Sequence, residues 1–214
     1  VIAVAARGET IDLLALVDHI GDPDPDVTAA VIEVLEKFQT GPVKEKMLDE
    51  LSTCPLRSWE RLIIALTTYP DEITYKSIIK SAISRLRVAN HYLICASEIR
   101  KEQGVDILLD QIDLQVDLTM SGVVRFLVSV AEADVINDLL ERLAADDEAQ
   151  RETAIELIGN IADPIVLRLL LPLLEKDVEV KTTLALQVSD SIPGDSITAI
   201  SHLMEEPDIW TQKA

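Results

Sequence analysis

The residues with the clearest chemical potential are four aspartates at regular spacing. They step by four, three and four residues, which would place them on one side of a continuous helix. They are Asp106, Asp110, Asp113 and Asp117. Such a row could bind a divalent cation through oxygen atoms. A repeat pattern in the chain, however, requires a helix to end near Leu114, so we expect the row to be divided and solvated.

The histidines and cysteines are far apart in the sequence. His19, His91 and His202 are isolated from one another, and the two cysteines show no CxxC or Cys/His spacing. We interpret Cys54 and Cys95 as small buried hydrophobic residues. Unpaired cysteines favour a reducing compartment, so we expect a cytoplasmic location.

Sequence motifs of enzymes and cofactor sites do not occur. The segment 22–26, Asp-Pro-Asp-Pro-Asp, resembles a calcium loop only superficially, because it lacks the central Gly and the distal Glu. No Gly-rich phosphate loop, nucleophile elbow or Ser/His/Asp set is visible, and the chain has only 7 glycines. We therefore predict a protein that is not an enzyme and that holds no cofactor and no metal.

Basic and aromatic residues gather in the middle of the chain. Arg, Tyr and Trp are the residues most often found as binding anchors, so this group could contact an acidic peptide or a phosphate group. The alternative is a solvated basic face with aromatic side chains in the core. The candidate partner-binding residues are Lys76, Lys80, Arg85, Arg87, Arg100, Lys101, Trp59 and Tyr92.

Acidic residues recur in the expected turns. In a stacked repeat protein, successive turns line up along one edge, so these residues could form a negative ridge that steers a basic partner. The alternative is that each one caps a helix or lies in its first turn, where the helix dipole favours negative charge. The candidate acidic edge is Asp22, Asp24, Asp26, Asp146, Asp147, Glu148, Asp177 and Glu179.

The overall charge narrows the class of partner. The chain has 19 Lys and Arg against 38 Asp and Glu, a net charge of −19, which repels phosphate backbones and disfavours nucleic acid. General solubility or adaptation to salt would give the same charge. No apolar stretch approaches the roughly 20 residues needed to cross a bilayer. The best candidate, Ile165–Leu174, is cut by Arg168 and Pro172 and is typical of a buried helix. We expect no membrane insertion by this segment.

The elements that position these residues follow a repeat. Seven anchor residues, each followed four places later by an apolar residue, recur at spacings of 32, 29, 28, 34, 30 and 30. The anchors are Val27, Trp59, Val88, Val116, Gln150, Val180 and Trp210. Apolar residues four apart indicate one face of a helix. A second apolar row about ten residues earlier predicts a partner helix, so each unit is a helical hairpin.

Such hairpins cannot bury both apolar faces alone and must stack. We therefore predict an all-α fold, a right-handed α-solenoid (superhelix) of about six to seven stacked antiparallel helix hairpins. Residues 1–214 would form a single domain, truncated within a repeat at both ends.

Three segments resemble HEAT-like repeats of the short bacterial type also seen in phycobilisome lyases. They are Asp22–Val27, Asp147–Gly159 and Asp163–Leu171. The resemblance covers nearly the whole chain and implies an armadillo-like α-solenoid. Many family members carry Val-Arg at the anchor, whereas here only Gln150-Arg151 comes close.

The repeat architecture predicts a non-catalytic scaffold or adaptor that binds another protein along its concave face or acidic turn edge. One alternative, implied by the resemblance, is a phycobilisome-lyase-like chaperone that attaches a bilin to a client protein. Another is a soluble segment of a larger transporter or signalling protein. HEAT-like DNA glycosylases need a basic groove, which the charge disfavours, and the isolated histidines lack the His-Glu pairs with which HEAT-like hydroxylases hold iron.

Overall fold

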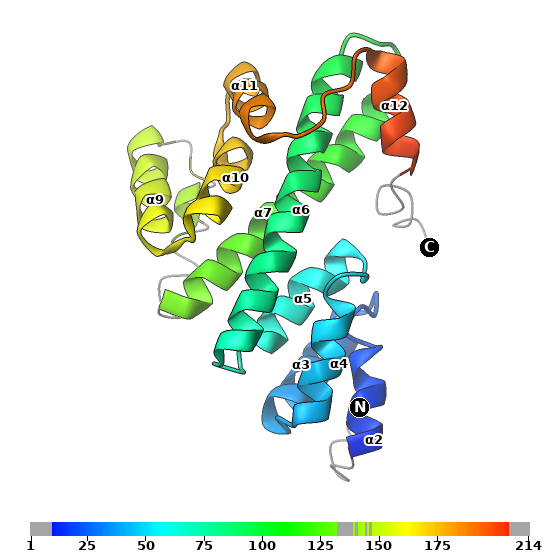
Figure 1. Ribbon diagram of the computed structural model, residues 1–214, viewed down its shortest axis with the longest axis vertical. Coiled ribbons are helices and arrows are strands. Elements are labelled where there is room, and N and C mark those ends of the chain that lie inside the picture. The colour runs from blue at the N-terminus through cyan, green and yellow to red at the C-terminus, as the bar shows by residue number, and fades with distance from the viewer. Residues whose placement is uncertain (1–9, 132–138, 140, 144, 146, 206–214) are drawn as a thin grey trace. The chain divides into compact units, whose positions relative to one another are not determined.

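The computed structural model describes residues 10–131, 139, 141–143, 145 and 147–205, and these residues form helices without any strand (Figure 1). The all-α prediction is confirmed. The chain divides into two compact units, residues 1–81 and 82–214, each of which is described by itself. Among the described residues, no helix is both long enough and apolar enough to cross a membrane.

The described residues of the first unit form two short helical hairpins, followed by the start of a long helix. Its helices are α2 (Thr10–Val17), α3 (Pro25–Lys37), α4 (Gly41–Glu50), α5 (Leu56–Leu66) and the first part of α6 (Glu72–Ile99). Helix α2 packs against α3 and α4, and α5 packs against the same two helices. Each hairpin therefore covers an apolar face of the other.

The turn between α2 and α3 determines where α3 begins and contacts the other hairpin. Asp24 is the N-cap of α3 and accepts a hydrogen bond from the Asp26 backbone N–H at 2.9 Å, and Pro25 begins the helix. From α5, Arg61 Nη1 donates to the Asp22 carbonyl and to Thr28 Oγ1, both at 2.8 Å. The arginine thereby fastens one hairpin to the turn of the other.

In the second unit, the described residues form the rest of α6 and five further helices. They are α7 (Asp106–Ala131), α9 (Glu148–Ile161), α10 (Pro164–Leu174), α11 (Val178–Val188) and α12 (Ser196–Glu205). Helix α10 packs against α7, α9 and α11, and α7 also packs against α9 (Figure 1). The apolar segment that we expected to be a buried helix is α10, which confirms that prediction.

The repeat pattern holds only in part. Val27, Gln150 and Val180 lie in the first turns of α3, α9 and α11, as predicted. The turns expected before Val88 and Val116 are wrong, because α6 runs unbroken for 28 residues and α7 for 26. Helix α6 contains no Pro or Gly and α7 has one Gly, so neither sequence contains a strong helix breaker. The last anchor, Trp210, lies outside the described residues.

The continuity of α7 also corrects the expected helix end near Leu114. Asp106, Asp110, Asp113 and Asp117 do share one continuous helix. The turn between α6 and α7 is made instead by residues 100–105, where Gly104 adopts a φ of 79°, a conformation that favours glycine. The helix break therefore falls at the Gly and not at the predicted repeat boundary.

Asp71, immediately before α6, stabilises the start of that helix. Its carboxylate accepts hydrogen bonds from the Thr74 backbone N–H at 3.0 Å and from Thr74 Oγ1 at 2.8 Å, and Lys44 Nζ lies 3.1 Å from Oδ2. These interactions, led by the Thr74 backbone, lower the pKa of Asp71 to about 2 from a model-peptide value of 3.8. The stabilisation is therefore present above about pH 4 and is lost as the pH falls towards 2.

We expect Asp71→Asn, which keeps the side-chain shape but cannot ionise, to lower the melting temperature at pH 7. The difference from wild type should shrink below about pH 4, because the wild-type carboxylate is then being protonated. Thermal unfolding followed by circular dichroism from pH 2 to 7 measures this. Asp49→Asn, on an exposed position of α4, is the control. A deficit that stays constant across the pH range would contradict the assignment.

Consecutive leucines in α10 test the packing of the second unit. Leu170 is fully buried, whereas Leu171 is 36% exposed. We expect Leu170→Ala to lower the free energy of unfolding by about 2 to 5 kcal/mol, because it removes buried methyl groups and leaves a cavity. Leu171→Ala should cost less than about 1 kcal/mol. Urea unfolding compares the two variants, and equal losses would show that the register of α10 is wrong.

Candidate functional site

The predicted aromatic anchors are buried in the structure. Trp59 is fully buried, and its indole N–H donates to Ser81 Oγ at 2.8 Å; the Ser81 hydroxyl in turn donates to the Leu51 carbonyl at 3.1 Å. Tyr92 is only 3% exposed. Both aromatic residues stabilise the core, so the expectation that they contact a partner is corrected. Their burial agrees with the alternative hypothesis, in which the aromatic side chains lie in the core.

Among the predicted basic residues, Arg85 is half-buried and the other five are exposed, and they do not all lie on one face of α6. Arg85 and Arg87 are two residues apart on α6, which places them about 200° apart around the helix axis. Lys76 and Lys80 lie in the part of α6 that belongs to the first unit, and Lys76 pairs with Glu72 at 2.6 Å. The remaining two follow the end of α6. They are Arg100 and Lys101.

The predicted acidic edge consists of helix caps and first-turn acids. Asp147 and Asp177 are the N-caps of α9 and α11, and each accepts a hydrogen bond from the backbone N–H two residues on. Lys176 Nζ donates to the Ala145 carbonyl at 2.7 Å, which brings these two turns of the second unit together.

The remaining acids have similar local roles. Glu148 and Glu179 lie in the first turns of their helices, and Asp22 accepts a hydrogen bond from the Asp24 backbone N–H at 2.9 Å. Asp26 lies in the first turn of α3. Asp146 lies outside the described residues. A continuous ridge along all these turns stays a prediction.

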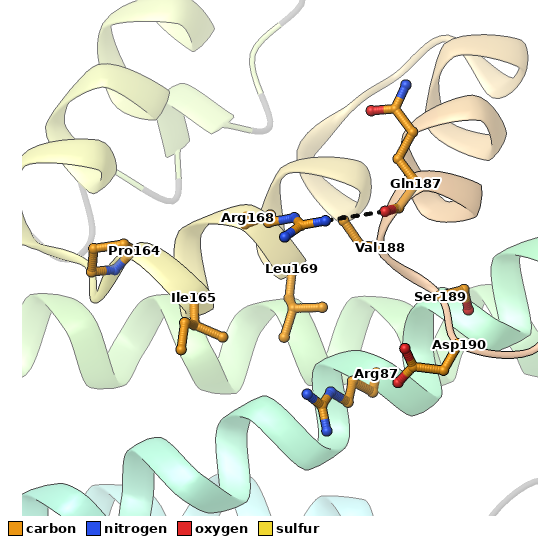
Figure 2. Close-up of a pocket in the computed structure, with 9 residues that line it drawn as sticks. All are labelled: Arg87, Pro164, Ile165, Arg168, Leu169, Gln187, Val188, Ser189 and Asp190. Carbon is orange, nitrogen blue, oxygen red and sulfur yellow. Dashed lines mark hydrogen bonds between the residues drawn. The ribbon is translucent and has the colours of Figure 1, made fainter.

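Arg87 faces a groove in the second unit, between α6, α10 and the segment that follows α11. Figure 2 shows the nine residues that line a cavity of about 420 Å³ there. An adjoining cavity of about 260 Å³ shares Arg87 and residues 188–190 and adds His91 to the lining. We call the two cavities together the Arg87 groove.

Local sequence explains the wall that α10 contributes. Asp163 caps the helix and accepts from the Ile165 backbone N–H at 2.8 Å, and Pro164 occupies its first position. Ile165, Arg168 and Leu169 follow at helical spacing and therefore share one face. Leu169 is buried and forms apolar floor, whereas Ile165 is 55% exposed.

A buried amide holds the two helical walls together. Asn90 is fully buried on α6, and its Nδ2 donates to the Leu86 carbonyl on the same helix and to the Leu169 carbonyl on α10, both at 2.8 Å. Two carbonyl acceptors determine which way the amide points. Because a hydrogen bond made away from water is costly to lose, Asn90 keeps α10 in register against α6.

The groove has more positive than negative side chains, whereas the chain as a whole is strongly negative. The nine residues that line its larger cavity include two arginines and one aspartate, Asp190, whereas the whole chain carries a net charge of −19. Arg168 Nη2 donates to the Gln187 carbonyl at 3.2 Å, as Figure 2 shows. Arg87 is exposed and makes no hydrogen bond or ion pair within the described part of the chain. Sequence reasoning found Arg87 but missed Arg168, whose spacing from Ile165 and Leu169 was the available signal.

The aspartate row on α7 has a cation beside it. Lys181 of α11 lies in electrostatic contact with Asp113 and Asp117. Burial raises the pKa of Asp117, and burial lowers the pKa of Lys181. The lysine charge therefore offsets part of the row, and a bound metal ion is not needed to explain it.

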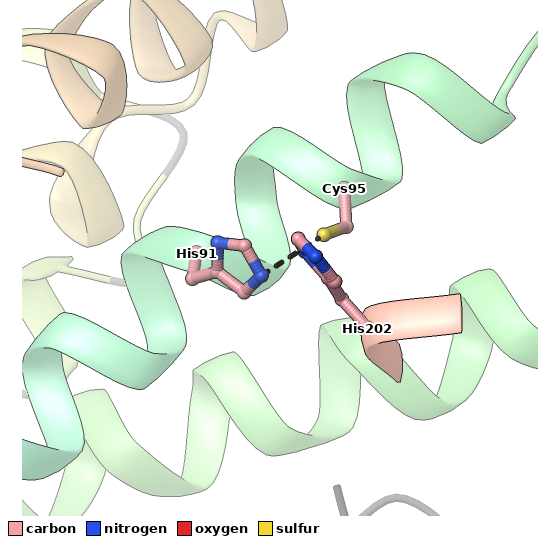
Figure 3. Close-up of side chains that lie close together, drawn as sticks. All are labelled: His91, Cys95 and His202. Carbon is pink, nitrogen blue, oxygen red and sulfur yellow. Dashed lines mark hydrogen bonds between the residues drawn. The ribbon is translucent and has the colours of Figure 1, made fainter. Parts of the chain in front are cut away.

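Three residues that sequence reasoning treated as isolated come together. His91 and Cys95 on α6 and His202 on α12 have ligand atoms that all lie within 4.8 Å of one another (Figure 3). Burial, together with the nearby Glu98, raises the pKa of the Cys95 thiol to about 11, so the free thiol is protonated at neutral pH. The spacing of four between His91 and Cys95 was the missed signal.

The chain matches no protein-family model, no curated protein and no solved structure. The resemblance to HEAT-like repeats therefore stays a prediction that rests on the residues quoted for it.

Proposed function

We propose that the protein is a non-catalytic scaffold that binds another protein, and that the Arg87 groove receives an acidic and apolar segment of that partner. The supporting observation is a concave site with an apolar floor and two guanidinium groups on a strongly acidic chain. In the same proposal, the hairpins of each unit belong to a right-handed α-solenoid, interrupted by the long helices α6 and α7. Cys54 and Cys95 are buried and form no disulfide, which is in keeping with a cytoplasmic location.

The chemistry of the groove favours a carboxylate. A guanidinium group binds a carboxylate through two parallel N–H···O bonds, which adds geometric specificity to charge attraction. Arg87 has no internal partner among the described residues, so binding an anion there breaks no existing ion pair. Arg168 donates only to a carbonyl and keeps further N–H groups for a ligand.

The apolar part of the groove favours a protein segment over a small anion. Ile165 lines the cavity and is 55% exposed, and Leu169 lies beside it. Covering Ile165 with an aliphatic or aromatic side chain would remove apolar surface from water. Asp190 also lines the groove, and its carboxylate disfavours ligands that carry only negative charge.

Peptide display tests this proposal without a known partner. We expect peptides selected on the wild-type chain from a random library to contain Asp or Glu near a large apolar residue. We expect Arg87→Glu together with Arg168→Glu to weaken their binding by at least about tenfold, because both attractive charges become repulsive. Fluorescence anisotropy with labelled peptides measures the affinities.

The matched control is Arg57→Glu with Lys80→Glu, which changes the net charge by the same amount at two exposed positions outside the groove. This variant should bind the selected peptides as the wild type does. Equal weakening in both double variants would show that general charge attraction accounts for binding. Selected peptides without acidic residues would overturn the assignment of the groove.

A further inference from the structure

We propose that His91, Cys95 and His202 form a binding site for one Zn²⁺ ion, with a water molecule as the fourth ligand. The site belongs to the second unit and is independent of the scaffold function proposed above. It joins two helices, because His91 and Cys95 come from successive turns of α6 and His202 comes from α12, as Figure 3 shows.

The two α6 residues already have the separation that zinc requires. Cys95 Sγ lies 3.5 Å from His91 Nε2. A tetrahedral zinc ion with Zn–S of about 2.3 Å and Zn–N of about 2.0 to 2.1 Å holds its sulfur and nitrogen ligands about 3.6 Å apart. A spacing of four residues on a helix gives this arrangement without any change in the backbone.

His202 completes the set from the opposite helix. Its ring lies 5.2 Å from that of His91, centroid to centroid, and is tilted by 37°. Its Nδ1 is buried and has no hydrogen-bond partner, and burying a polar atom in this way costs free energy unless a partner satisfies it. A metal ion is one such partner. Two zinc-bound nitrogens lie about 3.4 Å apart, so side-chain rotation closes the remaining distance.

The donor set selects the type of metal. One thiolate and two imidazoles suit zinc, whereas Ca²⁺ and Mg²⁺ require oxygen ligands. Binding converts the Cys95 thiol to a thiolate and releases its proton to solvent, one proton for each ion bound. Three protein ligands leave one tetrahedral position for water.

The bound ion would fasten α12 to α6. The segment between α11 and α12 contains Ser189 and Asp190, which line the Arg87 groove. At the start of α12, Ser196 Oγ donates to Glu102 Oε1 at 2.8 Å, a single exposed hydrogen bond. Coordination of His202 would hold the helix far more firmly, and ligand binding to the folded state alone raises stability by mass action.

Cobalt titration tests the site directly. The chain of residues 1–214, prepared without a histidine tag and kept reduced, is titrated with Co²⁺, which occupies zinc sites and absorbs visible light. We expect one equivalent to give the visible bands of tetrahedral cobalt and a thiolate-to-cobalt charge-transfer band in the near ultraviolet. Zn²⁺ should remove both and raise the melting temperature. A spectrum of octahedral cobalt without the charge-transfer band would overturn the proposal.

Variants then assign the ligands. Cys95→Ser should abolish the charge-transfer band, and Cys95→Ser and His202→Gln should each weaken binding by at least about 100-fold. Cys54→Ser, at the other buried cysteine, and His19→Ala, at a histidine outside the cluster, are the controls and should bind as the wild type does. Far-ultraviolet circular dichroism identifies any variant that fails to fold, and for His202 such a variant is replaced by His202→Asn. A charge-transfer band that survives in folded Cys95→Ser would overturn the assignment.

Discussion

In the second unit, a buried hydrogen bond from Asn90 joins α6 to α10 and sets the position of the candidate groove. Asn90 has no access to solvent, and its side-chain amide donates to a carbonyl of its own helix and to a carbonyl of α10. An apolar residue at this position could let the helices slide along each other, because dispersion contacts are not directional. The amide specifies one register. That register places Arg87, Ile165 and Arg168 around the same cavity.

Helix α6 can serve several sites because nothing in its sequence interrupts it. Its successive turns carry Arg87, which lines the groove, and Asn90, which donates a hydrogen bond to α10. They also carry His91 and Cys95, which lie close to His202 of α12. A helix as long as α6 requires a sequence without helix breakers and a stabilised first turn. Asp71 stabilises that turn by accepting a hydrogen bond from the Thr74 backbone N–H. The same uninterrupted run removes the turn that a uniform repeat would have placed at Val88.

Charge has two distinct roles in this chain. Many of its carboxylates act locally, since Asp24, Asp147 and Asp177 each satisfy backbone N–H groups at a helix start. Arginines act across longer distances, fastening turns in the case of Arg61 and lining a groove in the case of Arg87 and Arg168. An acidic surface of this kind makes the two guanidinium groups in the groove a local exception, which favours a partner that offers a carboxylate.

The sequence by itself determined the helical class, several helix starts and the buried character of α10. Those are local properties: apolar spacing of three and four residues, Asp caps and Pro positions carry the information within a few residues. The repeat fails at Val88 for a local reason too, because α6 contains no strong helix breaker there. Only the tertiary structure decided that Trp59 and Tyr92 are buried. Arg168 lies 81 residues beyond Arg87, and His202 lies 111 beyond His91, so no local pattern joins them. Long-range packing brings these side chains together, and that information is spread over the whole core.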